Sequence, residues 1–169
     1  NSNTSIGLTG NGTGDVPSFT AVNTGTAPVT ATITVTPSYT SGGVTCNGAS
    51  KTFTITVNPT GQVNDPADQV VSNGGTTTAV NFTSNNTGGT TTYAWTNNTT
   101  SIGLAASGTG NISAFTATNA GTAPVTATIT VTPTFTNGAT SCSGTAQTFT
   151  ITVNPAGQLN QPASQVVCN

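Results

Sequence analysis

The sequence predicts an all-β fold in which small β-sandwich units follow one another with a period of 96 residues. Two observations carry this prediction. Thr accounts for 42 of the 169 residues, and Thr, Val and Ile favour strands because a branched Cβ packs well on a pleated sheet. The apolar residues also alternate with Thr, which is the pattern of a strand with one buried and one solvated face. No segment has the period of a helix.

A long internal repeat sets the size of the unit. The segment GTAPVTATITVTP spans residues 25–37 and recurs unchanged at 121–133. A shift of 96 positions aligns residues 5–73 with 101–169 without a gap, and 45 of the 69 aligned positions are identical. A period of this length fits a small sandwich domain and is too long for a solenoid turn.

The phase of the repeat predicts three segments. Residues 60–155 form a complete copy, residues 1–59 correspond to the last two-thirds of a copy, and residues 156–169 begin a third. The first copy lacks counterparts of residues 60–96. We therefore expect it to close its core only with residues upstream of Asn1 or with another chain. Proline residues at both ends of each linker predict a semi-rigid joint between copies.

Alternation and Gly, Asn and Pro breaks place the strands of the complete copy. They are expected at residues 69–72, 76–84, 90–95, 110–119, 123–133 and 147–155. The residues predicted to face inward are Val80, Phe82, Tyr93, Trp95, Ile112, Phe115, Ala117, Val125, Ala127, Ile129, Val131, Phe149, Ile151 and Val153. The last two strands should form a hairpin around a loop at 136–146, with Pro124 and Pro133 near strand ends, where a missing N–H costs least.

The chain carries very little charge. Lys51 is its one cation and Asp15, Asp65 and Asp68 are its only acids, which gives a net charge of −2. This balance argues against nucleic acid and against anionic membrane surfaces as partners, because both are bound mainly through Lys and Arg. No apolar run approaches the roughly 18 residues of a membrane span. With no His and no Glu for acid–base work, we expect no enzyme activity and no cofactor.

Three motifs together resemble a known family. These are YAW at 93–95, the pattern SIGLxxxGxGxxxxFTAxNxGTAPVTATITVTP at 5–37 and again at 101–133, and TFTITVNP at 52–59 and 148–155. They are similar to the PKD-like tandem repeats of giant Bacteroidota surface proteins, including adhesins associated with gliding motility. The resemblance implies an immunoglobulin-like sandwich, export to the cell surface and a stalk or adhesive role. One departure is that Trp95 is followed by TNNTT, where PKD domains in the narrow sense have an acidic, Gly-rich turn.

Asp65 and Asp68 are the only close carboxylate pair. Calcium bound there would stiffen the junction between copies, because Ca²⁺ takes several oxygen ligands. Their counterparts Gln161 and Ser164 carry no charge, however, and a stalk that relied on calcium would be expected to keep its acids. The sequence therefore predicts no metal site, with this pair as the weak candidate.

The aromatic residues are the candidates for binding a ligand. Trp95 could stack on a sugar, but it shares a strand face with Tyr93, which favours a place in the core. Tyr39 and Phe135 are equivalent positions at the frayed end of a strand. They are the best candidates for exposed aromatic side chains.

The three cysteines are predicted to form no disulfide with one another. Cys46 and Cys142 are equivalent, and Cys168 corresponds to Ser72. We expect the positions of Cys142 and Ser72 to lie close enough for a bond within one copy. The complete copy has Ser72, so that pair is broken, and a bond from Cys142 to Cys168 would have to span the whole last strand.

These observations favour a non-enzymatic repeat of a long extracellular filament or adhesin stalk. Its expected partners are neighbouring repeats of the same chain, with surface polysaccharide or other filament subunits as further candidates. Two alternatives stay open. One is a carbohydrate-binding module, and the other is a self-assembling fibre in which another chain completes the first copy by strand donation.

Overall fold

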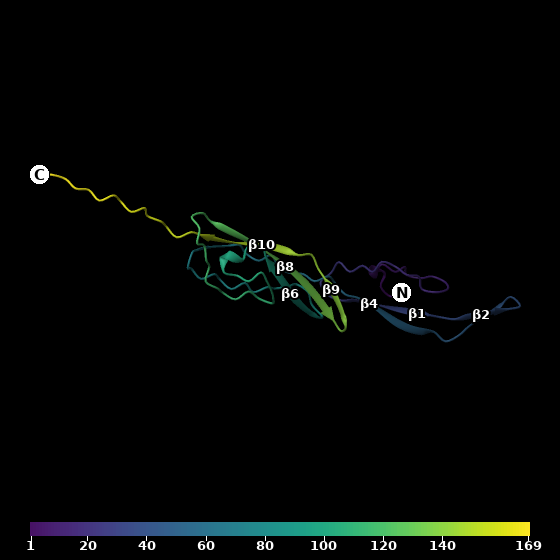
Figure 1. Ribbon diagram of the computed structural model, residues 1–169. Coiled ribbons are helices and arrows are strands. Elements are labelled where there is room, and N and C mark those ends of the chain that lie inside the picture. Colours follow the sequence, from purple (N-terminus) through teal and green to yellow (C-terminus); the bar gives the residue numbers. More distant parts are fainter. The chain divides into compact units, whose positions relative to one another are not determined.

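The computed structural model describes all residues from 1 to 169, and its regular secondary structure is almost entirely β-strand (Figure 1). The strands are β1 (Val29–Val35), β2 (Ser38–Ser41), β3 (Val44–Asn47), β4 (Lys51–Val57), β5 (Gln69–Ser72), β6 (Thr90–Asn97), β7 (Ser107–Thr109), β8 (Val125–Asn137), β9 (Thr140–Ser143) and β10 (Gln147–Asn154). Two short 3-10 helices, η1 (Thr4–Ile6) and η2 (Thr100–Ile102), complete the structure. The predicted all-β class is confirmed. Neither helix is long enough to cross a bilayer.

The chain divides into two compact units that do not follow the boundary of the sequence repeat. The first unit holds residues 1–64 together with 83–92 and 132–146, and the second unit holds the remainder. The first copy of the repeat therefore packs in one unit with two segments of the second copy.

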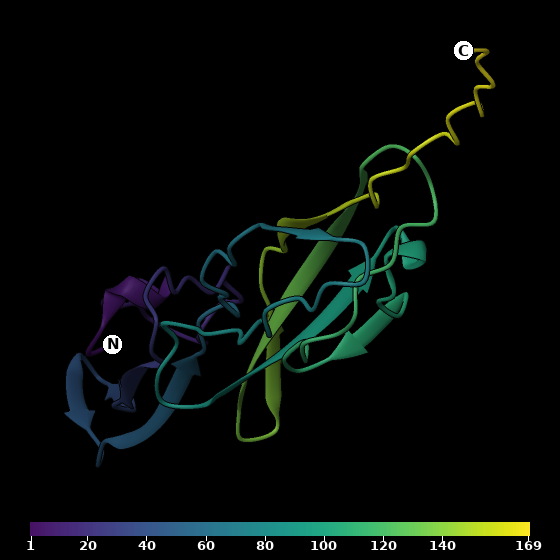
Figure 2. The same cartoon turned by 90° about the vertical axis from the view of Figure 1, so that its left-hand side faces the viewer.

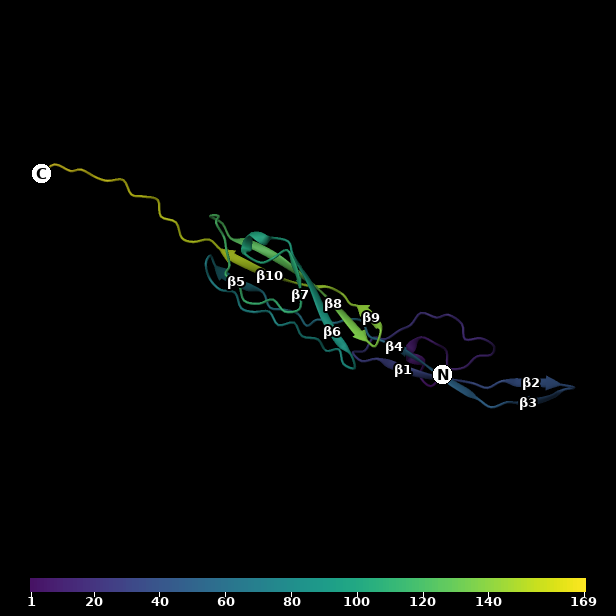
Figure 3. The same ribbon diagram turned by 60° about the horizontal axis from the view of Figure 1, so that its bottom comes forward.

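One sheet organises the second copy. Its strand order is β5-β10-β8-β6-β7, and β9 pairs with the far part of β8. Strands β8 and β10 are antiparallel, with Ala127 opposite Ile151, while β5 runs parallel to β10 (Figure 3). The residues of β8 and β10 predicted to face inward are buried from Ala127 to Val131 and from Phe149 to Val153, alternating with Thr. This alternation is what period-two patterning predicts.

Strand β8 is longer than the sequence indicated. It continues through Pro133 to Asn137, turns at Gly138 and returns as β9, so most of the expected loop at 136–146 is a hairpin arm (Figure 2). Pro133 lies in a gap, because pairing with β10 stops at Val131 and pairing with β9 starts at Thr134. Its carbonyl accepts a hydrogen bond of 2.9 Å from the N–H of Gly144. Since the N–H and C=O of a residue point to the same side, the missing donor faces this gap and interrupts neither ladder.

The expected strands at 76–84 and 110–119 are extended stretches and not regular strands. They are joined by two isolated bridges, of which one pairs Val80 with Ile112 through backbone bonds of 2.9 and 3.0 Å. Val80, Phe82 and Ile112 are buried, as predicted. The ring of Phe82 lies against the sheet, with centroids 5.4 Å from Tyr93 and 6.4 Å from Phe149.

Side-chain oxygens explain why these two stretches do not form a continuous ladder. The N–H of Phe82 donates to Oδ1 of Asn111 (2.9 Å), and the N–H of Phe115 donates to Oγ1 of Thr77 (3.0 Å). At both places an Asn or Thr side chain replaces the backbone carbonyl of the facing strand. Such local competition is characteristic of Asn and Thr.

The two helical turns occupy equivalent positions in the two copies, and the periodicity of the sequence does not reveal them. Ile6 in η1 and Ile102 in η2 are both fully buried. Each turn ends in a glycine with a left-handed backbone, Gly7 at φ 96° and Gly103 at φ 95°. The identical SIGL sequence therefore folds in the same way twice, as a single 3-10 turn that places one Ile in the core of each copy.

The first copy repeats the β8–β10 pairing, but its pair of strands forms a two-stranded sheet, whereas β8 and β10 belong to a six-stranded sheet. Strands β1 and β4 are antiparallel with Ala31 opposite Ile55, the same register as in the second copy, and β2 and β3 form a separate hairpin. Its core is a small cluster of Ile6, Leu8, Ala31 and Ile33.

Candidate functional site

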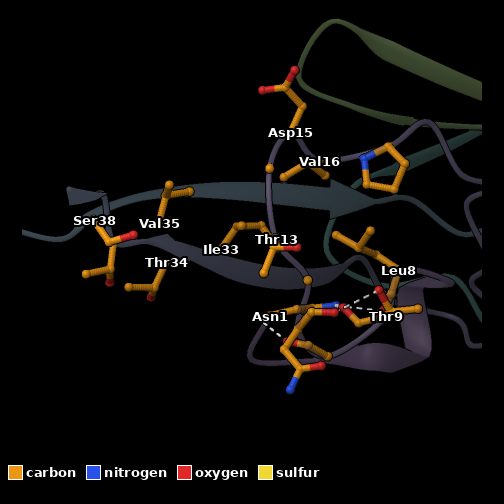
Figure 4. Close-up of a pocket in the computed structure, with 16 residues that line it drawn as sticks. Asn1, Leu8, Thr9, Thr13, Asp15, Val16, Ile33, Thr34, Val35 and Ser38 are labelled. Carbon is orange, nitrogen blue, oxygen red and sulfur yellow. Dashed lines mark hydrogen bonds between the residues drawn. The ribbon is translucent and has the colours of Figure 1, made fainter. Parts of the chain in front are cut away.

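A pocket of about 400 Å³ opens in the first copy, beside strand β1 (Figure 4). Its lining combines Ile33 and Val35 of β1 with Leu8 and the loop that follows. Asn1 closes one end. Its amino group donates to the carbonyl of Gly10 (2.9 Å) and its Nδ2 to the carbonyl of Leu8 (2.8 Å).

The chemistry of this pocket suits binding. Its one charged side chain is the Asp15 carboxylate, and the rest of the lining is apolar side chains, the polar side chains of Thr, Ser and Asn residues, and backbone. This lining offers apolar contact and backbone hydrogen bonds rather than a paired acid and base.

A second candidate site is the joint, by which we mean the linker at 60–64 and the loop and arm that hold it inside the first unit. Asn86 is at its centre. Its Oδ1 accepts a hydrogen bond from the N–H of Gln62 (2.7 Å), while its Nδ2 donates to the carbonyls of Thr60 (3.1 Å) and Thr26 (3.4 Å). One side chain thus ties the linker to a turn of the first copy.

The linker itself is packed. The N–H of Gly61 donates to the carbonyl of Cys142 (3.1 Å), and a Cβ at position 61 would lie 2.7 Å from the carbonyl oxygen of Pro133. Pro59 and Val63, on either side, are buried. Asn137 at the end of β8 also donates from Nδ2 to Oδ1 of Asn58 (3.0 Å). The linker is therefore held in place along its length.

The sequence does not single out Asn86 as a residue of the joint. It is one of many Asn residues in the chain, and its counterpart would fall ahead of residue 1, so the repeat offers no second example. Gly61 does recur, as Gly157 in the next linker. The recurrence of this glycine is the one feature of the sequence that indicates a close approach of another backbone segment to the linker.

The two candidate acids for a metal lie on the surface. Asp65 and Asp68 are both exposed, and Oδ1 of Asp68 accepts a hydrogen bond of 2.6 Å from the N–H of Thr150 in β10. This carboxylate therefore accepts a backbone hydrogen bond from β10 at the residue just before its pairing with β5 begins. No three Cys or Asp side chains gather into a group that could hold a metal ion.

Tyr39 and Phe135, which the sequence predicts to be exposed, differ completely in their exposure to solvent. Tyr39 on β2 is 73% exposed, whereas Phe135 on β8 is fully buried, so the prediction is wrong for Phe135. The backbone at Gly89 covers this ring, and a Cβ there would lie 2.5 Å from Cζ of Phe135.

The cysteines are all free thiols. Cys46 faces Tyr39 across the β2–β3 hairpin, Cys142 faces Phe135 across β8–β9, and Cys168 is exposed in the C-terminal segment. The expectation that position 72 lies near position 142 is wrong. Ser72 pairs with the last residue of β10, whereas Cys142 lies on the arm beyond the first residue of that strand.

Trp95 is a core residue. It is buried, it pairs with Gly108 of β7, and a Cβ at position 108 would lie 2.6 Å from its Cε2 atom. The indole therefore rests directly on a glycine backbone and presents no face to a sugar. Its Nε1 has no hydrogen-bond partner.

Comparison with family models, with curated proteins and with solved structures found no match for this chain.

Proposed function

We propose that this chain is a non-enzymatic structural segment of a long extracellular filament or adhesin stalk. In this proposal PKD-like, immunoglobulin-like sandwich copies follow one another outward from the cell surface and support adhesion or gliding. The sheet built on β8 and β10 is one layer of the sandwich. The stretches at 76–84 and 110–119 are the other.

The packed joint is the observation that carries this proposal. A flexible linker would let successive copies swivel, but here residues 60–64 are held by Asn86, by Gly61 against Pro133, and by the Asn58–Asn137 hydrogen bond. Interfaces between domains of one chain usually permit relative motion unless they are extensive. A packed, hydrogen-bonded linker is what a stalk that transmits force needs.

The outer faces of the strands also support a stalk. Thr side chains pair across neighbouring strands, as Thr126 with Thr152 (2.9 Å) and, in the first copy, Thr30 with Thr56 (2.8 Å). These faces are wet and uncharged. Contacts made through them with neighbouring repeats, surface polysaccharide or other filament subunits would depend little on salt, because screening acts on charges.

Electron microscopy of material shed from the surface of cells that produce the protein tests this proposal. We expect thin filaments with one bead per copy, labelled along their length by an antibody against residues 60–155. Labelling confined to permeabilised cells, or compact particles without beads, would refute it.

A carbohydrate-binding module is the second candidate, and the exposed ring of Tyr39 favours it. It predicts that a polysaccharide from the producing cell surface binds the chain and that Tyr39→Ala abolishes this binding. Phe53→Ala is the matched control, because that ring is also partly exposed but lies on β4. Equal binding by wild type and Tyr39→Ala would refute this candidate.

A further inference from the structure

Four Asn-Gly bonds occur in the chain, at residues 11–12, 47–48, 73–74 and 137–138. An Asn followed by Gly can deamidate without an enzyme. The backbone nitrogen of the glycine attacks Cγ of the Asn, and the glycine has no side chain to hinder this attack. The reaction requires a glycine N–H that is free of hydrogen bonds and an Asn side chain that can turn toward it. The surroundings of each bond therefore decide which of the four reacts.

Two of these bonds are held by the backbone. The N–H of Gly48 donates to the carbonyl of Pro37 (2.8 Å), and the N–H of Gly74 donates to the carbonyl of Ala117 (2.8 Å). The Oδ1 of Asn73 also accepts a backbone hydrogen bond of 2.9 Å. In both cases the structure must open locally before the glycine nitrogen can attack, so the reaction is slow in the folded chain.

The bond between Asn137 and Gly138 is held only at one side chain. Gly138 opens the two-residue turn between β8 and β9, where it is exposed and has φ 58°. The hydrogen bond of such a turn joins its two flanking residues, so the N–H of the first turn residue is left free, and that of Gly138 donates to no carbonyl. The Nδ2 of Asn137 donates to Oδ1 of Asn58 (3.0 Å), and both residues are half-buried. One hydrogen bond between partly exposed amides contributes little and opens readily.

We propose that Asn137 is a site of spontaneous deamidation. The nitrogen of Gly138 loses its proton and bonds to Cγ of Asn137, while the bond from Cγ to Nδ2 breaks and ammonia leaves with that proton. Water is the one co-reactant, and it opens the succinimide ring that results. Addition of water at Cγ gives aspartate, because the bond from Cγ to the Gly138 nitrogen breaks. Addition at the backbone carbonyl carbon breaks the other ring bond to that nitrogen and gives isoaspartate.

The modification loosens the end of the β8–β9 arm. Loop length fixes the register of a hairpin, and isoaspartate lengthens the backbone by one carbon directly before the turn. The pairing of position 137 with Thr140 is then lost. Both products also lose the Nδ2 that donates to Asn58, and the carboxylate in its place has no proton to donate. The inference does not depend on the filament proposal, because it concerns only one bond and the contacts around it.

The test is to age the purified full chain in mildly alkaline buffer and to locate each deamidated Asn by peptide mapping and tandem mass spectrometry. In the folded chain position 137 should react at least about tenfold faster than positions 47 and 73, because only those two require local opening. Asn11, in an exposed loop, marks the rate of an unheld Asn-Gly bond in the same sample. In urea positions 47, 73 and 137 should react at similar rates, because no contact then holds any of them.

Asn137→Ser is the matched control, because Ser is the counterpart at position 41 and cannot deamidate. Hydrogen exchange in the arm, at residues 136–143, should be at least about threefold faster in aged wild type than in fresh wild type. Ageing should leave exchange in Asn137→Ser unchanged. The proposal is overturned if position 137 reacts no faster than positions 47 and 73 in the folded chain. Equal exchange before and after ageing, in a sample in which isoaspartate predominates, would overturn the loosening of the arm.

Discussion

One substitution made at two equivalent positions tests the description of the core directly. Gly108→Ala would place a Cβ against the buried indole of Trp95, 2.6 Å from Cε2 and closer still to Cζ2. The ring is rigid and packed, so it cannot step aside as the end of a flexible chain would. Overpacking of this kind costs about 1–3 kcal/mol, and we expect the upper part of that range. Gly12→Ala meets nothing within 4 Å and should be neutral or stabilising by up to about 1 kcal/mol.

Urea unfolding followed by the emission of Trp95, the one Trp in the chain, measures the first variant. With a slope of about 1–3 kcal/mol per molar urea, the midpoint should fall by about 1–3 M for Gly108→Ala. Far-ultraviolet circular dichroism follows Gly12→Ala, whose site is remote in sequence from the reporter. The reasoning fails if the two substitutions shift the midpoint equally, or if Gly108→Ala leaves it unchanged.

Three further outcomes are expected. Phe149→Ala should lower the free energy of unfolding by about 3–5 kcal/mol in the same assay, because the ring is almost fully buried, and Phe53→Ala by no more than about half of that. Asn119 is buried, and its Nδ2 donates to the backbone carbonyls of Ala123 (2.9 Å) and Val153 (2.8 Å). Asn119→Ala leaves both carbonyls without this donor, so calorimetry should show that the free energy of unfolding falls by about 2–4 kcal/mol, and a fall below about 1 kcal/mol would contradict this role. Asn86→Ala should speed proteolysis within residues 60–64 with little change in the melting temperature, and an unchanged cleavage rate would show that the joint does not depend on this side chain.

The strand faces could be predicted because the sequence alternates without a break. From Val125 to Val131 and from Phe149 to Val153 every second residue is apolar and the others are Thr, so only one face can be buried. The same reasoning placed Trp95 in the core. Where one period governs a segment, its burial follows from the sequence.

The errors arose where distant residues decide the outcome. Phe135 precedes a Gly- and Ser-rich stretch and looks like a fraying end, but the backbone at Gly89 covers it. The stretches at 76–84 and 110–119 have strand composition, yet Asn111 and Thr77 supply side-chain acceptors that replace the ladder. Neither effect leaves a local pattern in the sequence.

The parallel pairing of β5 with β10 has a mechanical consequence. The chain enters the second copy through β5 and leaves it through β10, and these neighbouring strands point the same way through four residue pairs, from Gln69–Ile151 to Ser72–Asn154. Tension applied across the copy pulls β5 at its N-terminal end and β10 at its C-terminal end. Because the two strands are parallel, these forces act in opposite directions along the strand axes. All four pairs are then loaded together in shear and are not peeled apart one by one. The two strands that connect the copy to the rest of the chain form the clamp that resists its extension.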